Sequence, residues 1–338
     1  MKAAIYKGIG KIEVSEIKKP ENDDESAIVK INTVGICGTD LKTFKRGHPM
    51  FKPPCILGHE FVGTVEEVGK KLNENLIGKT FVIAPYLECG KCDLCLKEKP
   101  EHCKNKVWVE GAMTEYLKVP KELMLRGAIE IPENVDEKTA TLTEPLACAI
   151  HGIERINPRS GEKLLIIGAG PMGLLLAITL RNRGCQVTIV EINDARLNII
   201  KGNGFEAIDA KEISIPSLIE NRGKFDHAIL ATDASSVVSD LLESINPGGK
   251  LQLFGGMPKE IRLEIDPYYI HYKEIDLIGS FGFSERHFKT AFDEIANNVS
   301  SYSKLVTEEM DLNEIEKAFL TAMKPENIKV VVKVSNIA

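Results

Sequence analysis

A short apolar run that leads into three closely spaced glycines constrains the fold of this chain more than any other feature. Leu164–Ile167 is continuously apolar, as expected for a strand that is buried on both faces of a parallel sheet. Gly168, Gly170 and Gly173 follow with the spacing G-x-G-x-x-G, and an apolar helical pattern continues from there. A glycine turn from strand into helix lets backbone N–H groups and the positive helix terminus approach a pyrophosphate. This stretch therefore predicts a dinucleotide-binding turn.

A carboxylate at the end of the next predicted strand indicates which dinucleotide is bound. Val187–Val190 is a second apolar run, and Glu191 follows it directly. An acid at this separation from the glycines typically binds the ribose hydroxyls of NAD, and its charge repels the 2′-phosphate of NADP. Arg196 is the nearby cation that could offset this repulsion. We therefore predict NAD over NADP, with Pro171 and Met172 of the glycine turn, Glu191 and Arg196 among the cofactor-binding residues.

The hydrophobic pattern indicates an α/β chain with two kinds of domain. Residues 1–155 contain short β-like runs between turns, which suit a small, mostly antiparallel barrel. Residues 156–284 alternate strands with helices, which predicts a doubly wound parallel sheet with right-handed crossovers. Residues 285–338 add two helical patterns and a β run. The predicted strands are Ala3–Tyr6, Ile12–Val14, Ala27–Val34, Phe61–Val68, Thr80–Ala84, Leu164–Ile167, Val187–Val190, Asp226–Ala231, Lys250–Phe254, one near Ile275–Ile278 and Lys329–Val334, and the predicted helices include Gly173–Arg183, Asp194–Asn203, Ser236–Ile245, Glu285–Asn297 and Leu312–Met323.

Composition argues against several classes of partner. The net charge is −6, and Lys and Glu are mixed along the chain, so neither nucleic acid nor a membrane surface is an expected partner. No apolar run is long enough to span a bilayer, and the first residues lack the apolar core of a signal peptide. We therefore expect a cytoplasmic protein. In that compartment the eight cysteines are expected to be metal ligands, catalytic groups or buried thiols.

Four cysteines within one short stretch predict a closed zinc site. Cys89, Cys92, Cys95 and Cys103 have the spacing C-x2-C-x2-C-x7-C. Each short loop lets two thiolates converge on one ion at about 2.3 Å. Sulfur then occupies all four positions, so this zinc would hold the lobe at residues 86–104 together and would bind neither water nor substrate.

A second set of metal-binding residues is spread along the chain. Cys37, the pair His59–Glu60 and Glu144 offer a thiolate, an imidazole and carboxylates. Such mixed ligands are typical of a catalytic zinc that keeps one position open. Each of these motifs is weak evidence alone, because a single cysteine or His–Glu pair is more often a packed polar group. Cys148, four residues after Glu144, is a rival thiolate ligand.

Taken together, these motifs resemble the zinc-dependent medium-chain dehydrogenases, the alcohol and polyol dehydrogenase superfamily. The resemblance covers essentially the whole chain and lies in the order and separation of its motifs. These are Cys37-Gly-Thr-Asp, Gly58-His-Glu, the four-cysteine lobe, Thr143-Glu-Pro-Leu and Gly168-Ala-Gly-Pro-Met-Gly. It implies a GroES-like catalytic domain that takes back the C-terminal segment, a Rossmann domain between the two parts, and a homo-oligomer, either a dimer or a tetramer.

The resemblance also implies roles for individual residues. Cys37, His59 and Glu144 look like direct zinc ligands. Glu144 stands where sorbitol- and sugar-type members have glutamate and where simple alcohol dehydrogenases have a second cysteine. Glu60 resembles the carboxylate beside the zinc, which can bind the metal directly or through water. Asp40 resembles the acceptor that orients His59.

The resemblance leaves more than one route open for the substrate proton. Thr39 resembles the hydroxyl that passes this proton outward. Many members have a histidine three residues later that relays it to solvent, whereas this chain has Lys42. Either Lys42 relays the proton, or the proton leaves through water or through His48, and the sequence leaves these routes open.

The implied activity is hydride transfer between the carbinol carbon of a secondary alcohol and the nicotinamide of NAD, with two zinc ions per chain. We expect a polyol or sugar as the substrate, because a carboxylate ligand leaves zinc harder than a second thiolate would, and a 1,2-diol can chelate such a metal. Oxidation of L-threonine or of a simple alcohol is the alternative among enzymes. A nucleotide-binding protein without turnover is the non-enzymatic alternative, and intact Cys37, His59 and Glu144 argue against it.

Overall fold

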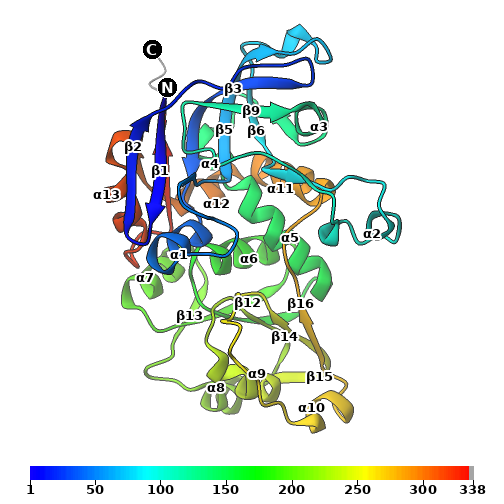
Figure 1. Ribbon diagram of the computed structural model, residues 1–338. Coiled ribbons are helices and arrows are strands. Elements are labelled where there is room, and N and C mark those ends of the chain that lie inside the picture. The colour runs from blue at the N-terminus through cyan, green and yellow to red at the C-terminus, as the bar shows by residue number, and fades with distance from the viewer. Residues whose placement is uncertain (335–338) are drawn as a thin grey trace. The chain divides into compact units, whose positions relative to one another are not determined.

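The computed structural model describes residues 1–334 and divides into two compact units (Figure 1). The first unit joins Met1–Ala147 to the segment that begins at Phe283, and the second is Cys148–Gly282. The first division falls inside helix α5 (Thr143–Ile156), the helix that also contains the boundary expected at residue 155. Residues 335–338 of the expected C-terminal region lie outside the described residues.

The main sheet of the first unit is mostly antiparallel and is completed by the C-terminal segment. In order, its strands are β10 (Ala128–Glu130), β6 (Thr80–Ile83), β5 (Glu60–Val68), β3 (Ser26–Gly35), β18 (Lys329–Lys333) and β17 (Val306–Asp311), and β9 (Tyr116–Pro120) also pairs with β3. The first half of β3 pairs with β9 and its last three residues pair with β18, both antiparallel. Nearly every residue of β3 is buried, so both faces of this strand are covered.

Two small sheets and several helices surround this main sheet. The remaining strands are β1 (Lys2–Gly8), β2 (Lys11–Glu16), β4 (Cys55–Ile56), β7 (Tyr86–Leu87) and β8 (Val107–Trp108), and the helices are α1 (Gly38–Arg46), α2 (Asp93–Leu96), α3 (Lys121–Arg126), α4 (Glu137–Ala140), α11 (Glu285–Asn297), α12 (Val299–Tyr302) and α13 (Ile315–Ala322). Helix α13 buries Ile315, Ala318 and Phe319, which lie on one face at the spacing of a helix turn. The ring of Phe319 lies 5.3 Å from that of Phe44 on α1, so the C-terminal segment also supports α1.

The second unit contains a six-stranded parallel sheet. Its order is β13 (Glu206–Asp209), β12 (Gln186–Glu191), β11 (Lys163–Ile167), β14 (Phe225–Leu230), β15 (Ile245–Leu253) and β16 (Asp276–Gly279). Its helices are α6 (Pro171–Asn182), α7 (Asp194–Gly202), α8 (Ile215–Arg222), α9 (Val238–Glu243) and α10 (Pro267–His271), besides most of α5. The strand order changes direction at β11, which is where doubly wound sheets bind nucleotides. The predicted α/β fold class, with an antiparallel domain and a Rossmann domain, is confirmed.

Side-chain alternation along β11 distributes its residues between two hydrophobic layers. Leu165 and Ile167 belong to a core that also contains Leu218 of α8 and Leu241 of α9. Leu164 and the other intervening residues are equally buried but point to the opposite face. Figure 1 shows α6 on that opposite side of the sheet from α8 and α9. The continuous apolar run that predicted this strand is thus explained by helices on both faces.

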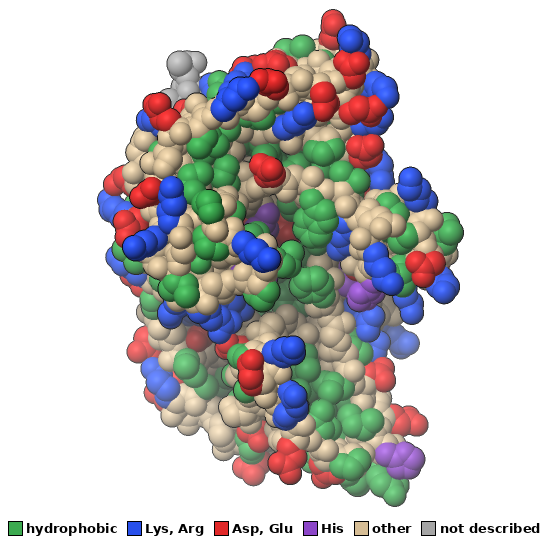
Figure 2. Space-filling model, in the orientation of Figure 1, with side chains coloured by type: hydrophobic (Ala, Val, Ile, Leu, Met, Phe, Trp, Pro, Cys, Tyr) green, Lys and Arg blue, Asp and Glu red, His purple; other side chains and the backbone are tan. Residues whose placement is uncertain are grey.

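The viewed surface carries both signs of charge. Figure 2 shows Lys and Arg interspersed with Asp and Glu, without a large region of one sign. Among residues 1–334, no helix is both long enough and apolar enough to cross a membrane.

Candidate functional site

The ends of two neighbouring strands bring Cys37 and His59 together. Strand β3 ends at Gly35, two residues before Cys37, and strand β5 begins at Glu60, directly after His59. Because the two strands are antiparallel and Gly35 pairs with Glu60, both segments meet at the same edge of the sheet. One ligand atom each from Cys37, His59 and Glu60 lies within 4.8 Å of the others. These three residues form the first candidate metal cluster.

A single buried carboxylate fixes the two segments that carry this cluster. Asp40 accepts hydrogen bonds from the backbone N–H of Cys37 at 3.0 Å and of Gly58 at 3.3 Å. Its Oδ1 also lies 3.6 Å from Nδ1 of His59. Cys37 is the N-cap of α1, and its Sγ accepts a hydrogen bond from the N–H of Thr39 at 3.4 Å. The sulfur of Cys37 therefore lies at the N-terminus of α1, within reach of a backbone donor.

Glu60 and Lys329 form an ion pair in the interior of the first unit. The Lys329 Nζ donates to Oε2 of Glu60 at 2.6 Å, and their side chains are 2% and 0% exposed. Lys329 opens strand β18, which pairs with the end of β3, so the C-terminal segment delivers this cation. Burial would lower the pKa of Lys329, but the charges of Glu60 and Cys37 outweigh it and raise that pKa.

Glu144 lies in the first turn of α5 and is also buried. Burial raises the pKa of Glu144 to about 7, and the negative charge of Glu60 adds to the shift while His59 and Lys329 oppose it. Glu144 is therefore within electrostatic reach of the cluster, although the group with ligand atoms within 4.8 Å contains Glu60 in its place. Its role as a zinc ligand stays a prediction.

The charges in this region fit a divalent cation. Cys37, Glu60 and Glu144 are acidic groups within electrostatic reach of the buried ammonium of Lys329, and Asp40 is a further buried carboxyl beside His59. Burial raises the pKa of Asp40. Burial would lower the pKa of His59, but interactions with Asp40 and Cys37 outweigh it and raise that pKa well above its usual value. Within residues 1–334, Glu60 Oε1 is one of two buried side-chain polar atoms that lack a hydrogen-bond partner. The raised pKa values of the carboxyls of Asp40 and Glu144, the unsatisfied oxygen of Glu60, and the presence of sulfur, nitrogen and oxygen donors together suit zinc.

The predicted proton-relay residues occupy α1 and the turn after it. Thr39 is half-buried in the first turn of α1, two residues from the Cys37 ligand. Lys42 is exposed on the same helix. His48 follows the helix, and its Nδ1 accepts a hydrogen bond from the N–H of Met50 at 3.3 Å. The structure leaves the roles of Thr39, Lys42 and His48 as predictions.

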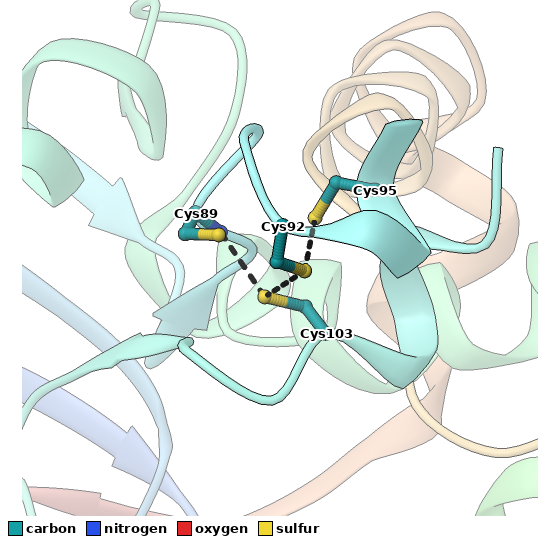
Figure 3. Close-up of side chains that lie close together, drawn as sticks. All are labelled: Cys89, Cys92, Cys95 and Cys103. Atoms are coloured by element: carbon teal, nitrogen blue, oxygen red, sulfur yellow. Dashed lines mark hydrogen bonds between the residues drawn. The ribbon is translucent and has the colours of Figure 1, made fainter. Parts of the chain in front are cut away.

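The four-cysteine lobe forms a second and separate candidate metal cluster. The sulfur atoms of Cys89, Cys92, Cys95 and Cys103 converge on one point (Figure 3). Cys92 Sγ lies 3.5 Å from Cys95 Sγ and 3.8 Å from Cys103 Sγ. Sulfur atoms at 2.3 Å from a tetrahedral zinc are about 3.8 Å apart, so the observed spacing fits such an ion.

The thiol pKa values of this lobe also call for a cation. Backbone N–H groups, above all that of Cys95, lower the pKa of Cys92 to about 6. Burial and the neighbouring sulfurs of Cys92 and Cys103 raise the pKa of Cys95 to about 12. Four adjacent thiols do not all ionise unless a positive charge balances the thiolates that form. A bound zinc provides that charge and fills the set of four ligands.

The lobe is attached at both ends to the start of α11. Glu88, next to Cys89, accepts a hydrogen bond from the N–H of Glu285 at 3.1 Å. Arg126 donates to Oε2 of Glu285 at 2.7 Å and to the carbonyl of Glu88 at 3.0 Å. At the other end of the lobe, Glu101 lies 3.4 Å from Nδ1 of the buried His287. The C-terminal segment therefore supports this cluster as well.

In the second unit, the glycine turn has the geometry of a phosphate-binding loop. Gly168 has φ +99°, and a Cβ there would lie 2.2 Å from a methyl group of Thr232. A Cβ on Gly173 would lie 2.0 Å from the carbonyl oxygen of Gly168, so glycine permits the close packing of helix on turn. Gly170 is the N-cap of α6 and has no side-chain cap, and Pro171 occupies the first turn. Backbone donors at this helix end are thus left for an anion.

The glycine turn holds the carboxylate of Glu191 in place. Its Oε2 accepts from the N–H of Ala169 at 2.8 Å, and its Oε1 accepts from those of Ile192 and Asn193. The Arg196 Nη1 lies 3.9 Å from Oε2 of Glu191. The carboxylate therefore links the end of β12 to the glycine turn, while Arg196 is partly exposed beside it.

Sequence reasoning missed two features of the first cluster. Asp40 was expected to orient His59, but it also binds the backbone of Cys37 and Gly58. A cap residue followed three positions later by an acid is a capping-box pattern, which would have predicted the first of these bonds. Sequence patterns place Lys329 only within a β run, and a lysine directly before three consecutive valines, Val330–Val332, which the structure buries, was the available signal.

Two family models match the chain over nearly its whole length. Residues 23–132 match the alcohol dehydrogenase GroES-like domain, and residues 137–334 match the glucose dehydrogenase C-terminus. D-arabinitol dehydrogenase 1 of Uromyces fabae is 30% identical over 83% of this chain and 82% of its own length. L-threonine 3-dehydrogenase of Burkholderia thailandensis is 30% identical over 97% of both chains.

A solved structure shows the same fold. It is a protein of Sinorhizobium meliloti 1021 described as a zinc-binding dehydrogenase, in complex with NADP. It superimposes with a TM-score of 0.88 at 26% identity, covering 98% of this chain and 99% of its own.

Proposed function

Because the chain belongs to the superfamily of zinc-dependent medium-chain dehydrogenases, we propose that it oxidises a secondary CH–OH group of a polyol or sugar with NAD as the hydride acceptor. The observation that carries this proposal is the cluster of half-buried Cys37 and His59 with buried Glu60, which lies apart from the four-cysteine lobe. One cluster has mixed ligands suited to catalysis, and the other has only sulfur. We therefore propose one catalytic and one structural zinc ion per chain.

The residues of the first cluster have distinct tasks in this proposal. A zinc ion bound by Cys37, His59 and Glu144 supplies a Lewis acid that makes the substrate hydroxyl easier to deprotonate. Asp40 holds the backbone of both ligand segments and orients the imidazole of His59. The Thr39 hydroxyl accepts the substrate proton and passes it outward, through Lys42, His48 or water. The glycine turn and Glu191 would hold NAD, which would accept the carbinol hydrogen as hydride, so that the overall reaction gives a carbonyl product, NADH and a proton.

The carboxylate-rich cluster supports a polyhydroxylated substrate. With Glu144 in place of a second thiolate, the metal keeps more of its positive charge and favours oxygen ligands. Two neighbouring hydroxyls of a polyol can then chelate it, which a simple primary alcohol cannot do. The similarity to D-arabinitol dehydrogenase 1 agrees with this class of substrate. The similarity to L-threonine 3-dehydrogenase makes threonine the second candidate.

A panel of substrates tests the proposal. NAD reduction is measured with pentitols, hexitols, aldoses, L-threonine, ethanol and butanol at equal concentrations. We expect the highest kcat/KM with a polyol or sugar. A higher kcat/KM with threonine would establish the second candidate, and turnover of ethanol or butanol equal to that of the best polyol would refute the proposed substrate class. The absence of turnover with every compound would favour a nucleotide-binding protein.

We propose NAD as the preferred cofactor because Glu191 places a negative charge beside the glycine turn. The matched variants Glu191→Gln and Glu191→Ala separate the effect of its charge from the effect of its hydrogen bonds to the backbone. Glu191→Gln retains an oxygen acceptor for the backbone and removes the charge, so the preference for NAD over NADP is expected to narrow by roughly ten- to a hundredfold. Glu191→Ala also removes the support of Ala169, so we expect weaker binding of both cofactors. Equal use of NAD and NADP by the unaltered protein would contradict the proposal.

A cytoplasmic location and assembly into a homodimer or homotetramer remain part of the proposal. The assembly is supported by exposed aromatic and aliphatic side chains on α10 and in the turn that follows it, including Tyr268, Ile270 and Tyr272. Figure 2 shows an apolar surface at the position of α10. Sedimentation equilibrium at micromolar concentration, compared with Tyr272→Glu, tests it, and a monomeric unaltered protein would contradict it.

A further inference from the structure

The two oxygens of the Glu60 carboxylate have different surroundings. Oε2 is bound to Lys329 Nζ at 2.6 Å, and it lies so close to the backbone of Gly35 that a Cβ there would be 2.3 Å away. Oε1 is buried and has no hydrogen-bond partner among the described residues. An unsatisfied carboxylate oxygen in a protein interior is costly unless another group or ion completes it. Glu60 is therefore tied through one oxygen and available through the other.

The position of Lys329 couples this carboxylate to the ligand segment of Cys37. Its Nζ also donates to the carbonyl of Ile36 at 3.3 Å, and Ile36 precedes Cys37. In addition, the N–H of Ile36 donates to the carbonyl of Val330 at 3.0 Å. Lys329 and Glu60 are separated by 269 residues, so this contact depends on the return of the C-terminal segment to the sheet. Burying both charges is unfavourable unless they are paired, which makes the pair sensitive to the loss of either member.

On the basis of the proposed catalytic zinc, we infer that Lys329 is a positioning residue that restrains Glu60 and thereby keeps one coordination position open for the substrate. A buried carboxylate that loses its ammonium partner is unstable unless another cation pairs with it. For Glu60, that cation would be the zinc proposed at Cys37 and His59. Glu60 would then become a permanent ligand and close the position that the substrate hydroxyl needs. Gly35 contributes to the same restraint, because the lack of a side chain lets Oε2 lie against β3 within reach of Lys329.

Replacement of zinc by cobalt makes the coordination visible. The variants are Lys329→Met, which keeps an unbranched side chain one atom shorter and without its charge, and Lys333→Met, a matched control on the same strand. The visible spectrum of each cobalt-loaded protein is recorded after subtraction of Cys37→Ser, which retains only the four-cysteine cluster. The rate of metal extraction by a chelator and the values of kcat and KM are measured alongside.

For Lys329→Met we expect weaker d–d absorption, as for a metal with an additional oxygen ligand, together with slower extraction. We also expect a kcat that is roughly 10–100-fold lower. Lys333→Met should behave as the unaltered protein does, and Lys329→Arg should restore most of the spectrum. In a Glu60→Gln background, Lys329→Met should have no further effect, because Lys329 acts through Glu60.

A cobalt spectrum and an extraction rate unchanged by Lys329→Met would overturn the inference, as would an effect that persists in full in the Glu60→Gln background. If Lys329→Met does not fold, Gly35→Ala displaces Oε2 from Lys329 without removing a charge and should give the same spectral change. An unchanged spectrum in Gly35→Ala would then overturn it. Failure of the unaltered protein to bind cobalt outside the four-cysteine cluster would instead refute the proposed function.

Discussion

The two cysteine-containing clusters of the first unit are built in opposite ways. The four-cysteine cluster takes all of its sulfurs from residues 89–103. The cluster of Cys37, His59 and Glu60 is assembled from the end of β3 and the start of β5, and a lysine from the C-terminal strand completes its charges. The first can therefore form from one loop, whereas the second requires the folded sheet.

This difference separates a metal that stabilises the fold from one that depends on it. Because the cysteines are close together in sequence, their sulfurs can reach one zinc ion without contacts from the rest of the fold, and the metal then organises the loop. In the other cluster, Asp40, Lys329 and the strand register position the ligands before any metal binds. Such preorganisation is what a catalytic site requires, because its ligands leave one position open.

The largest effect is expected from removal of a ligand in the assembled cluster. Cys37→Ser should lower the rate of NAD reduction to near background, because an alcohol side chain is a poor zinc ligand in place of a thiolate. Metal analysis of the purified variant should find one zinc per chain, retained by the four-cysteine lobe. Full activity with two zinc ions would show that the clusters are not divided as proposed.

The next effect concerns the third ligand of the assembled cluster. We expect Glu144→Ala to lose the catalytic zinc and activity together, because removing the carboxylate leaves only Cys37 and His59 of the proposed ligands. Cys148→Ala, four residues along the same helix, is the matched control and should keep both. Zinc content and kcat/KM are measured for each. Loss of zinc in Cys148→Ala with retention in Glu144→Ala would reverse the assignment.

Disruption of the four-cysteine cluster should affect the free energy of unfolding more than the rate of turnover. Cys95→Ser is expected to destabilise the protein by on the order of 3–5 kcal/mol, as for loss of a structural metal, with a secondary effect on turnover. Thermal unfolding is compared with that of Cys55→Ser, which changes a half-buried cysteine outside both clusters. A variant that keeps its stability but loses kcat would assign a catalytic role to this lobe.

The smallest effect appears when the assembled cluster is emptied of metal. The pKa of Glu144 is raised to about 7 by burial, so its stabilising contribution is complete below the unfolded pKa and is lost as pH rises through the folded value. The metal-free Glu144→Gln variant should therefore melt several degrees higher than the metal-free unaltered protein at pH 8, and nearly equally at pH 5. Calorimetry of chelator-treated protein measures this. Equal melting temperatures at pH 8 would show that ionisation of buried Glu144 does not destabilise the metal-free protein.

The sequence predicted those parts of the molecule that depend on local patterns. The apolar run and glycine turn identified β11 and α6, and spacing alone identified the four-cysteine cluster. Cys37 and His59 could be joined only through the family resemblance, because their proximity depends on strand register. Lys329 was missed for the same physical reason, since no pattern within the chain indicates which buried carboxylate a lysine 269 residues away will meet. Among the missed elements is β13, an edge strand with acids at both ends, Glu206 and Asp209.

Anomalous diffraction at the zinc absorption edge tests the central claim most directly. The account predicts two peaks per chain, one surrounded by the four cysteine sulfurs and one bonded to Cys37, His59 and Glu144, with Glu144 oxygen at about 2.0–2.2 Å from the metal. A single peak at the four-cysteine cluster, or a second peak bonded to Cys148 Sγ with Glu144 turned away, would contradict it.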